Sequence, residues 1–89
     1  MTDNFVAHNI GQELIRFTQS ARKHKIGKGR VLYVVEHYQR QTIVDLKSSD
    51  IKYQWIGADD RGVNLEIIAV ATPAYLLVIH VMPYEFRRK

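Results

Sequence analysis

Apolar residues in one part of the chain follow the spacing of an amphipathic helix. They recur at intervals of three and four positions, at Val31, Val34, Val35 and Tyr38, and this spacing places their side chains on one face of a helix. Two glycines mark its start as a break from the preceding segment. The pattern predicts a helix over residues 28–39 whose valine face packs on the core.

The second half of the chain alternates with the period of a β-strand. Three runs are rich in Val, Ile, Leu and aromatic residues, at 51–55, 63–71 and 75–82. Turn signals at 59–62 and 72–74 separate the runs, and Gly62 suits the left-handed position of a three-residue hairpin loop. The pattern predicts an antiparallel β-meander, and a short run at 42–46 predicts an added edge strand.

The lengths of the two turns predict the register of this meander. With three-residue loops, Trp55 lies opposite Ile67, and Glu66 lies opposite His80 with their Cβ atoms about 5 Å apart. One face then carries no charge, and we expect helices to cover it. Its members are Ile51, Tyr53, Trp55, Leu65, Ile67, Ala69, Leu77, Ile79 and Val81. The other face gathers the polar residues Lys52, Gln54, Asn64, Glu66 and His80 beside Ile68, Val70, Leu76 and Val78.

The segment before residue 27 leaves two alternatives open. In the first, one long helix places on the same face Ile10, Leu14, Phe17, Ala21 and His24. In the second, a strand covers 14–17, and Thr18 or Ser20 caps a short helix that ends near Ile26. The periodicity of the apolar residues does not separate the two.

The composition describes one small domain and excludes several classes of protein. We expect residues 1–11 to form an N-terminal arm and residues 12–89 to form one α+β domain, because chains of this length rarely divide. The absence of cysteine excludes disulfides and thiolate metal sites. Short apolar runs and the lack of a signal-peptide core predict a cytoplasmic protein without membrane contact. The sequence lacks metal-ligand spacings and nucleotide-binding loops, so we expect no metal and no cofactor.

Positive charge is clustered along the sequence. The chain has 13 Lys and Arg against 9 Asp and Glu. Five of these cations are Arg22, Lys23, Lys25, Lys28 and Arg30, and three more end the chain at 87–89. Such clusters bind RNA or DNA through release of counterions from the phosphates. The alternative is that they form a solvated surface.

The predicted register brings together one pair of side chains suited to proton transfer. A carboxylate beside an imidazole fixes the tautomer of the ring, which makes Glu66 and His80 candidate catalytic residues. The alternative is an ordinary cross-strand ion pair. His24, which cations flank, is either a further base or donor, or a structural residue that caps the short helix or packs beneath the next one.

Three segments resemble BrnT-like toxins of type II toxin–antitoxin systems. Residues 17–27, Phe-Thr-Gln-Ser-Ala-Arg-Lys-His-Lys-Ile-Gly, are similar to the strand, short helix and R-K-H-G-V/I junction of that family, with Lys25 at the position of the glycine. Residues 55–66 resemble the family's hairpin. Residues 79–88, which begin Ile-His-Val-Met-Pro, resemble its last strand and basic C-terminal stretch. The resemblance covers residues 14–88.

The resemblance implies a fold and an activity. The fold is RelE-like: two or three N-terminal helices and a short strand pack on one face of a three- to four-stranded antiparallel meander. This favours the strand at 14–17 over the long helix. The activity is that of a metal-independent endoribonuclease, which inhibits translation by cutting RNA, including ribosome-associated mRNA, and which a cognate antitoxin neutralises.

The resemblance also assigns residues by position. It places Lys23 and His24 on the first junction, Arg61 on the hairpin, and His80, Tyr84 and Arg87 on the C-terminal stretch. With the pair and the charge clusters above, the candidate catalytic residues are His80, Glu66, His24 and Tyr84. The candidate RNA-binding residues are Arg22, Lys23, Lys25, Lys28, Arg61, Arg87 and Arg88.

An interpretation of a different class is a non-catalytic relative of the same fold. Such a module would use the apolar end of the sheet and its edge strand to form a homodimer or to add a peptide strand. A DNA-binding regulator is a third interpretation, but no segment has the pattern of a recognition helix with base-reading side chains.

Overall fold

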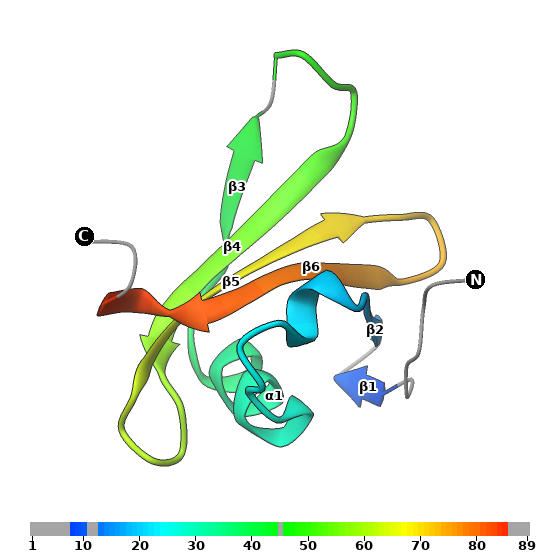
Figure 1. The fold of residues 1–89 in the computed structure, drawn as a ribbon. Coiled ribbons are helices and arrows are strands. Elements are labelled where there is room, and N and C mark those ends of the chain that lie inside the picture. The colour runs from blue at the N-terminus through cyan, green and yellow to red at the C-terminus, as the bar shows by residue number, and fades with distance from the viewer. Residues whose placement is uncertain (1–7, 11–12, 45, 86–89) are drawn as a thin grey trace.

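The computed structural model describes residues 8–10, 13–44 and 46–85, which form one sheet with an α-helix packed against it (Figure 1). The strands are β1 (His8–Ile10), β2 (Glu13–Phe17), β3 (Gln41–Val44), β4 (Ile51–Ala58), β5 (Asn64–Ala71) and β6 (Leu76–Pro83). The helical elements are the 3-10 turn η1 (Ser20–Arg22) and the helix α1 (Lys28–His37).

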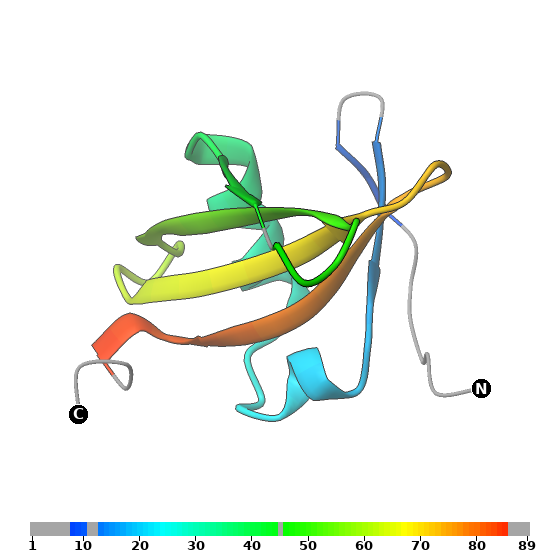
Figure 2. The same cartoon turned by 90° about the horizontal axis from the view of Figure 1, so that it is seen from above.

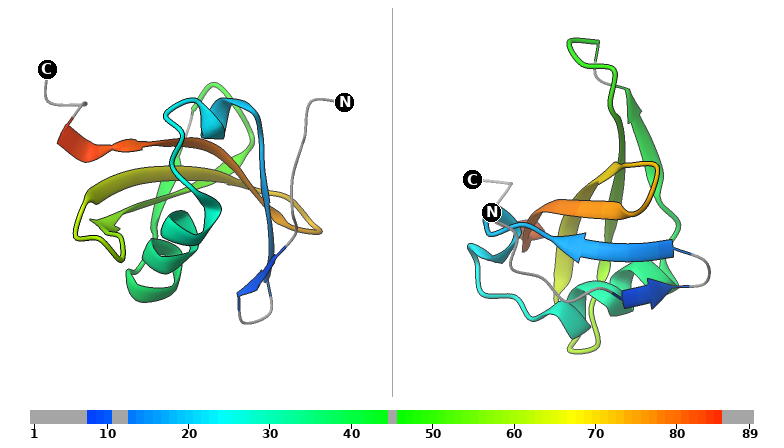
Figure 3. Two further views of the ribbon diagram at one scale, coloured as in Figure 1. Left: turned by 60° about the horizontal axis from the view of Figure 1, so that its bottom comes forward. Right: turned by 90° about the vertical axis from the view of Figure 1, so that its right-hand side faces the viewer.

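The six strands lie in the order β1-β2-β6-β5-β4-β3. Neighbouring strands are antiparallel except β2 and β6, which run parallel. Helix α1 packs against β4 and β5, and Figure 2 shows it on one face of the sheet. The β1–β2 hairpin lies at one edge (Figure 3), while the β3–β4 hairpin extends away from the rest of the molecule at the other edge (Figure 1).

The predicted fold class was wrong in both its helices and its sheet. We expected two or three N-terminal helices on a three- to four-stranded antiparallel meander of RelE type. The described residues instead hold one α-helix, one 3-10 turn and a six-stranded mixed sheet. The predicted short strand at 14–17 forms, but it pairs with β6 inside the sheet instead of packing on its face. Its Ile15 and Phe17 are each 1% exposed and alternate with the less buried Leu14 and Arg16, which is the period of a strand.

Parallel pairing of β2 with β6 is the part of the fold that the pattern of residues did not reveal. Ile15 is the partner of Leu76, and Phe17 is the partner of Val78. Parallel strands are joined by a long crossover rather than a tight turn. Here, two helical elements and three strands (η1, α1, β3, β4 and β5) separate β2 from β6 in the sequence, so no local turn signal indicates the pairing.

Several predicted elements are present individually. Helix α1 confirms the helix predicted over 28–39, although it ends at His37. The predicted strand at 14–17 is β2, and the predicted edge strand at 42–46 is β3, so the long-helix alternative is wrong. Of the predicted arm, His8–Ile10 form β1, and the rest lies outside the described residues.

The short helix predicted after β2 is only a 3-10 turn. The predicted cap, Thr18 or Ser20, was wrong, because the N-cap residue is Gln19 and its side chain makes no capping hydrogen bond. The Thr18 hydroxyl lies one residue earlier and accepts a hydrogen bond from the N–H of Ala21 at 3.2 Å. The turn ends within a few residues because Lys25 has a φ of 59°, in the left-handed region that a helix does not use. The chain therefore leaves η1 and starts α1 in a new direction.

The register of β4 with β5 was predicted correctly, but that of β5 with β6 was not. The turn between β5 and β6 is one residue longer than expected. The Thr72 hydroxyl organises it by accepting a hydrogen bond from the N–H of Tyr75 at 2.9 Å and donating one to the Tyr75 carbonyl oxygen at 2.7 Å. Strand β6 also contains an extra residue: Val78 and His80 pair with consecutive residues of β5, and Ile79 between them has no partner there.

These two extra residues decide which side chains of β6 enter the core. Leu76 and Val78 are buried, at 3% and 1% exposed, in place of the predicted Leu77 and Ile79. Beyond the bulge the alternation returns to the predicted phase, so Val81 is buried again. Because of the bulge, β6 buries side chains in the core both before Ile79, at Val78, and after it, at Val81.

The core lies between α1 and the sheet. Its largest fully buried side chains are Phe17, Ile15, Leu65, Ile67, Val31, Val34, Val78 and Val81. Trp55 joins them as predicted, at 3% exposed, whereas Ile51 is exposed at the far end of β4. Tyr38, which was expected on the core face of the helix, is also largely exposed. Its ring covers Gly57, where a Cβ atom would lie 2.5 Å from it.

A buried ion pair ties α1 to the β4–β5 turn. Oδ2 of Asp59 accepts a hydrogen bond from Nε of Arg30 at 2.6 Å, and Oδ1 accepts from the N–H groups of Arg61 and Val63 at 2.8 and 2.9 Å. Gly62 completes the turn with a φ of 83°, as predicted. Burial alone would raise the pKa of Asp59. The hydrogen bonds from Val63, Arg30 and Arg61, with the charge of Arg30, outweigh burial and hold that pKa below its usual range.

We expect Asp59→Ala to lower the free energy of unfolding by about 1–3 kcal/mol, because the turn loses three hydrogen bonds to a charged acceptor. A lowered pKa in the folded state means that this stabilisation is present above about pH 4 and is lost as the pH falls through the folded-state pKa. Denaturant titrations from pH 7 to pH 3 measure both effects. The exposed neighbour Asp60 is the control, and equal losses in Asp59→Ala and Asp60→Ala would contradict this account.

Candidate functional site

A buried carboxylate lies on the face of the sheet opposite α1. Glu66 is 4% exposed. Its Oε1 lies 3.1 Å from Nε2 of His80, and its Oε2 accepts a hydrogen bond from Nε2 of Gln54 at 2.8 Å. The three residues come from the central strands β5, β6 and β4, so the best-paired part of the sheet positions them. We refer to Gln54, Glu66 and His80 as the carboxylate cluster.

The structure brings Glu66 and His80 together through an alignment that differs from the predicted one. The partner of Glu66 across the strands is Met82, and the partner of His80 is Ile68. The two side chains are therefore diagonal neighbours rather than directly opposed, and long side chains reach one another at that separation. The bulge at Ile79 is what leaves His80 on this face of the sheet.

The carboxylate determines how His80 holds its proton. An ionised carboxylate only accepts hydrogen bonds, so Nε2 of the ring must donate to Glu66. In the neutral ring, Nδ1 is then the nitrogen with a free lone pair. The His80 side chain is 35% exposed and that of Glu66 is 6% exposed. The ring thus connects a buried negative charge to the surface, which suits a group that takes up and returns a proton.

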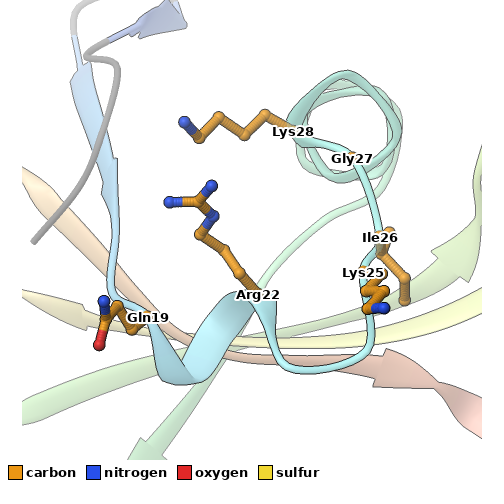
Figure 4. Close-up of a pocket in the computed structure, with 6 residues that line it drawn as sticks. All are labelled: Gln19, Arg22, Lys25, Ile26, Gly27 and Lys28. Atoms are coloured by element: carbon orange, nitrogen blue, oxygen red, sulfur yellow. The ribbon is translucent and has the colours of Figure 1, made fainter.

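A second group of candidate residues surrounds a pocket of about 680 Å³ between η1 and the start of α1 (Figure 4). Its described lining is Gln19, Arg22, Lys25, Ile26, Gly27 and Lys28, and we refer to it as the basic pocket. Figure 4 shows Arg22 and Lys28 extending toward the same space on the side of β2, whereas Lys25 points away. The Lys28 ammonium lies 5.8 Å from the centre of the Phe17 ring of β2, which holds it toward that side.

The backbone adds to the positive potential of the basic pocket. Helix α1 begins at Lys28 after Gly27, which has no side chain to cap it, and its first turn contains no acidic residue. The first N–H groups of a helix carry partial positive charge and are not used within the helix. The described lining itself contains three cations and no acid.

The other candidate residues lie on loops. Lys23 is exposed and His24 is half-buried on the turn that follows η1, and neither belongs to the described lining of the basic pocket. Tyr84 is half-buried directly after β6, and Arg61 is exposed on the β4–β5 turn. The candidates Arg87 and Arg88 lie outside the described residues.

The sequence did not reveal that Gln54 donates a hydrogen bond to Glu66. The predicted register already placed Gln54 on the same face as Glu66, and this was the available signal. A glutamine on a solvent-facing strand position is common, however, and nothing in its spacing marks it as the second partner of a buried carboxylate. The hydrogen bond follows from the depth to which Glu66 is buried, which the sequence does not state.

Within residues 8–10, 13–44 and 46–85, no group of three or more His, Asp or Glu side chains is placed to hold a metal ion. No helix in these ranges is long and apolar enough to cross a membrane. Comparison of the chain with protein-family models, curated proteins and solved structures finds no match.

Lys25 offers a test of the backbone that shapes the basic pocket. A non-glycine residue in the left-handed region costs about 1–2 kcal/mol, and glycine avoids that cost. We expect Lys25→Gly to raise the free energy of unfolding by about 0.5–1 kcal/mol after the entropy of glycine is subtracted. Lys23 is the matched control, because its φ of −57° is helical and glycine there should destabilise by a similar amount. Denaturant titration of both variants decides, and a loss of stability in Lys25→Gly would contradict the assignment.

Proposed function

We propose that this chain is a toxin-like RNA-binding protein of the cytoplasm, a metal-independent endoribonuclease that inhibits translation and that a cognate antitoxin neutralises. The observation that carries the proposal is the 3.1 Å contact between the buried Glu66 carboxylate and the half-exposed ring of His80. A buried carboxylate that fixes an accessible imidazole is the arrangement that general acid–base catalysis requires.

The chemistry of RNA cleavage assigns a role to each member of the carboxylate cluster. Nδ1 of His80 takes the proton of a ribose 2′-hydroxyl, and the 2′-oxygen attacks the adjacent phosphorus. The bond from phosphorus to the 5′-oxygen breaks, and an acid returns a proton to that oxygen. The products are a 2′,3′-cyclic phosphate and a 5′-hydroxyl end. Glu66 stabilises the imidazolium that forms, and Gln54 holds Glu66 in place.

Two further candidates remain for the proton donor to the leaving oxygen. Tyr84 follows β6, the strand that carries His80, and His24 lies on the turn after η1, which packs against β6. Both can donate a proton, and cations near the phosphate would stabilise the negative charge of the transition state. Because they are positively charged, we also propose phosphate contacts for Arg61, Arg87 and Arg88.

The backbone at residue 25 supports the resemblance to BrnT-like toxins. The family's junction motif has glycine at the position of Lys25, and Lys25 has a φ of 59°. This is the left-handed region that favours glycine. The conformation is what a chain that shares the family's junction would retain after losing the glycine, and it is rare for lysine otherwise.

The charge of the segment 22–30 supports the proposed binding of RNA. Arg22, Lys25 and Lys28 line the basic pocket, and Lys23 lies exposed beside it. Sites for single strands on small domains cover about 4–16 nucleotides. The molecule measures 32 × 29 × 26 Å, so one single-stranded region, such as that of ribosome-associated mRNA, is long enough to contact both the basic pocket and the carboxylate cluster.

A second candidate function is that of a non-catalytic homodimer module. The exposed apolar side chains on the β3–β4 hairpin favour it. Val44, Leu46 and Ile51 are 76%, 95% and 52% exposed. Strand β3 is an edge of the sheet, and its outer backbone groups can pair with β3 of a second copy in antiparallel fashion. Such pairing would bring the same three side chains of both copies together.

The enzyme proposal predicts the effect of one substitution most directly. His80→Ala should lower the rate of cleavage of a single-stranded RNA by about 10²–10⁴-fold, the usual contribution of a general base. Glu66→Gln should lower it by a smaller factor, because the base remains and only its support is lost. Gel analysis of a labelled RNA measures the rates, and end-group analysis should find the cyclic phosphate.

His37→Ala is the control, because His37 lies exposed on α1 with its ring stacked on Tyr33. The melting temperature of each variant should stay within a few degrees of the wild type. If His80→Ala cuts RNA as fast as the wild type, the assignment of the base is wrong. If the wild type leaves RNA uncut, does not arrest growth when expressed without a partner and sediments as a dimer that Val44→Lys disrupts, the second candidate replaces the first.

A further inference from the structure

We propose that the basic pocket binds a phosphomonoester, the group found at the end of a 5′-phosphorylated RNA chain. This inference deepens the proposed function and rests on it only in taking RNA as the carrier of the phosphate. It assigns the pocket a role distinct from cleavage, because the carboxylate cluster lies on other elements and contributes no residue to the lining.

Two of the three cations in the described lining converge instead of following a line, and the third, Lys25, points away (Figure 4). Arg22 comes from the end of η1 and Lys28 from the start of α1, and both side chains extend into one space (Figure 4). A groove for a continuous strand spaces its cations so that each meets a different phosphate along the backbone. Two cations that converge on one space can together bind a single group of high negative charge.

The charge of the pocket fits a monoester better than a diester. A phosphodiester carries one negative charge, whereas a phosphomonoester carries about 1.5–2 at pH 7 and presents three acceptor oxygens. The planar guanidinium of Arg22 can bind two of these oxygens at once, and the ammonium of Lys28 can bind the third. The start of α1 adds to the field that these side chains create.

The volume of the pocket limits what accompanies the phosphate. Pockets for small ligands measure about 300–1,000 Å³, and this one, at about 680 Å³, is large enough for one nucleotide. Gln19, at the rim nearest β2, offers an amide that can both donate to and accept from a base or sugar (Figure 4). The ligand is thus a terminal nucleotide with its phosphate, either on an RNA chain or free.

Three ligands of matched chemistry test the inference by fluorescence anisotropy and competition. They are an RNA hexamer with a 5′-phosphate, the same hexamer with a 5′-hydroxyl, and adenosine 5′-monophosphate. We expect the phosphorylated hexamer to bind at least tenfold more tightly than the hydroxyl form. The double variant Arg22→Gln/Lys28→Gln should abolish this preference. Lys23→Gln, which removes a cation outside the described lining, should weaken both hexamers alike and keep the preference.

The outcomes separate this inference from the proposed function. Equal binding of the two hexamers by the wild type, or a preference that the double variant retains, would overturn the pocket assignment and leave RNA binding intact. Binding of the free nucleotide without binding of either hexamer would support the pocket and remove RNA from the proposed function. Competition by the nucleotide at the concentration that displaces the phosphorylated hexamer would support the pocket and identify the free nucleotide as its source.

Discussion

An extra residue in β6 is the constraint on which the rest of the structure depends. Strand β6 lies between β2 and β5, so it must fill the core along its whole length while pairing on both sides. The bulge at Ile79 changes the phase of its side chains, which buries Val78 before it and Val81 after it. The same change turns His80 to the opposite face, where it meets Glu66. Core packing and the candidate site therefore depend on one local irregularity.

Gln54 and His80 both contribute to keeping the buried Glu66 carboxylate stable. A carboxylate that loses its water on burial costs several kcal/mol unless other groups replace the lost hydrogen bonds. Gln54 and His80 each supply one of these bonds to Glu66, from strands on either side of it. An exposed pair at the same positions would contribute under about 1 kcal/mol and would leave the imidazole free to rotate. Burial thus makes the contact a fixed geometry, and a fixed geometry is what proton transfer needs.

Local patterns predicted α1 and the strands β2 to β6 but not β1, and non-local constraints explain how the strands pair. Valines at helical spacing predicted α1, and the β4–β5 register followed from Gly62 and its turn. The parallel pairing of β2 with β6 and the bulge at Ile79 have no local signal, because packing of the whole sheet selects them. Within the candidate site, Glu66 and His80 were placed on the correct face although their alignment was two residues off. The amide of Gln54 could be assigned only once the burial of Glu66 was known.

If the buried Glu66 carboxylate orients the ring of His80, it also decides which ring nitrogen carries the proton. Nitrogen-15 NMR of the histidine side chains at neutral pH distinguishes the two neutral tautomers of each ring. We expect the neutral ring of His80 to carry its proton on Nε2 and to leave Nδ1 unprotonated, whereas an imidazole with no fixed partner exchanges between the two forms. A His80 ring that carries its proton on Nδ1, or that averages between the two forms as a free imidazole does, would show that Glu66 does not fix the ring.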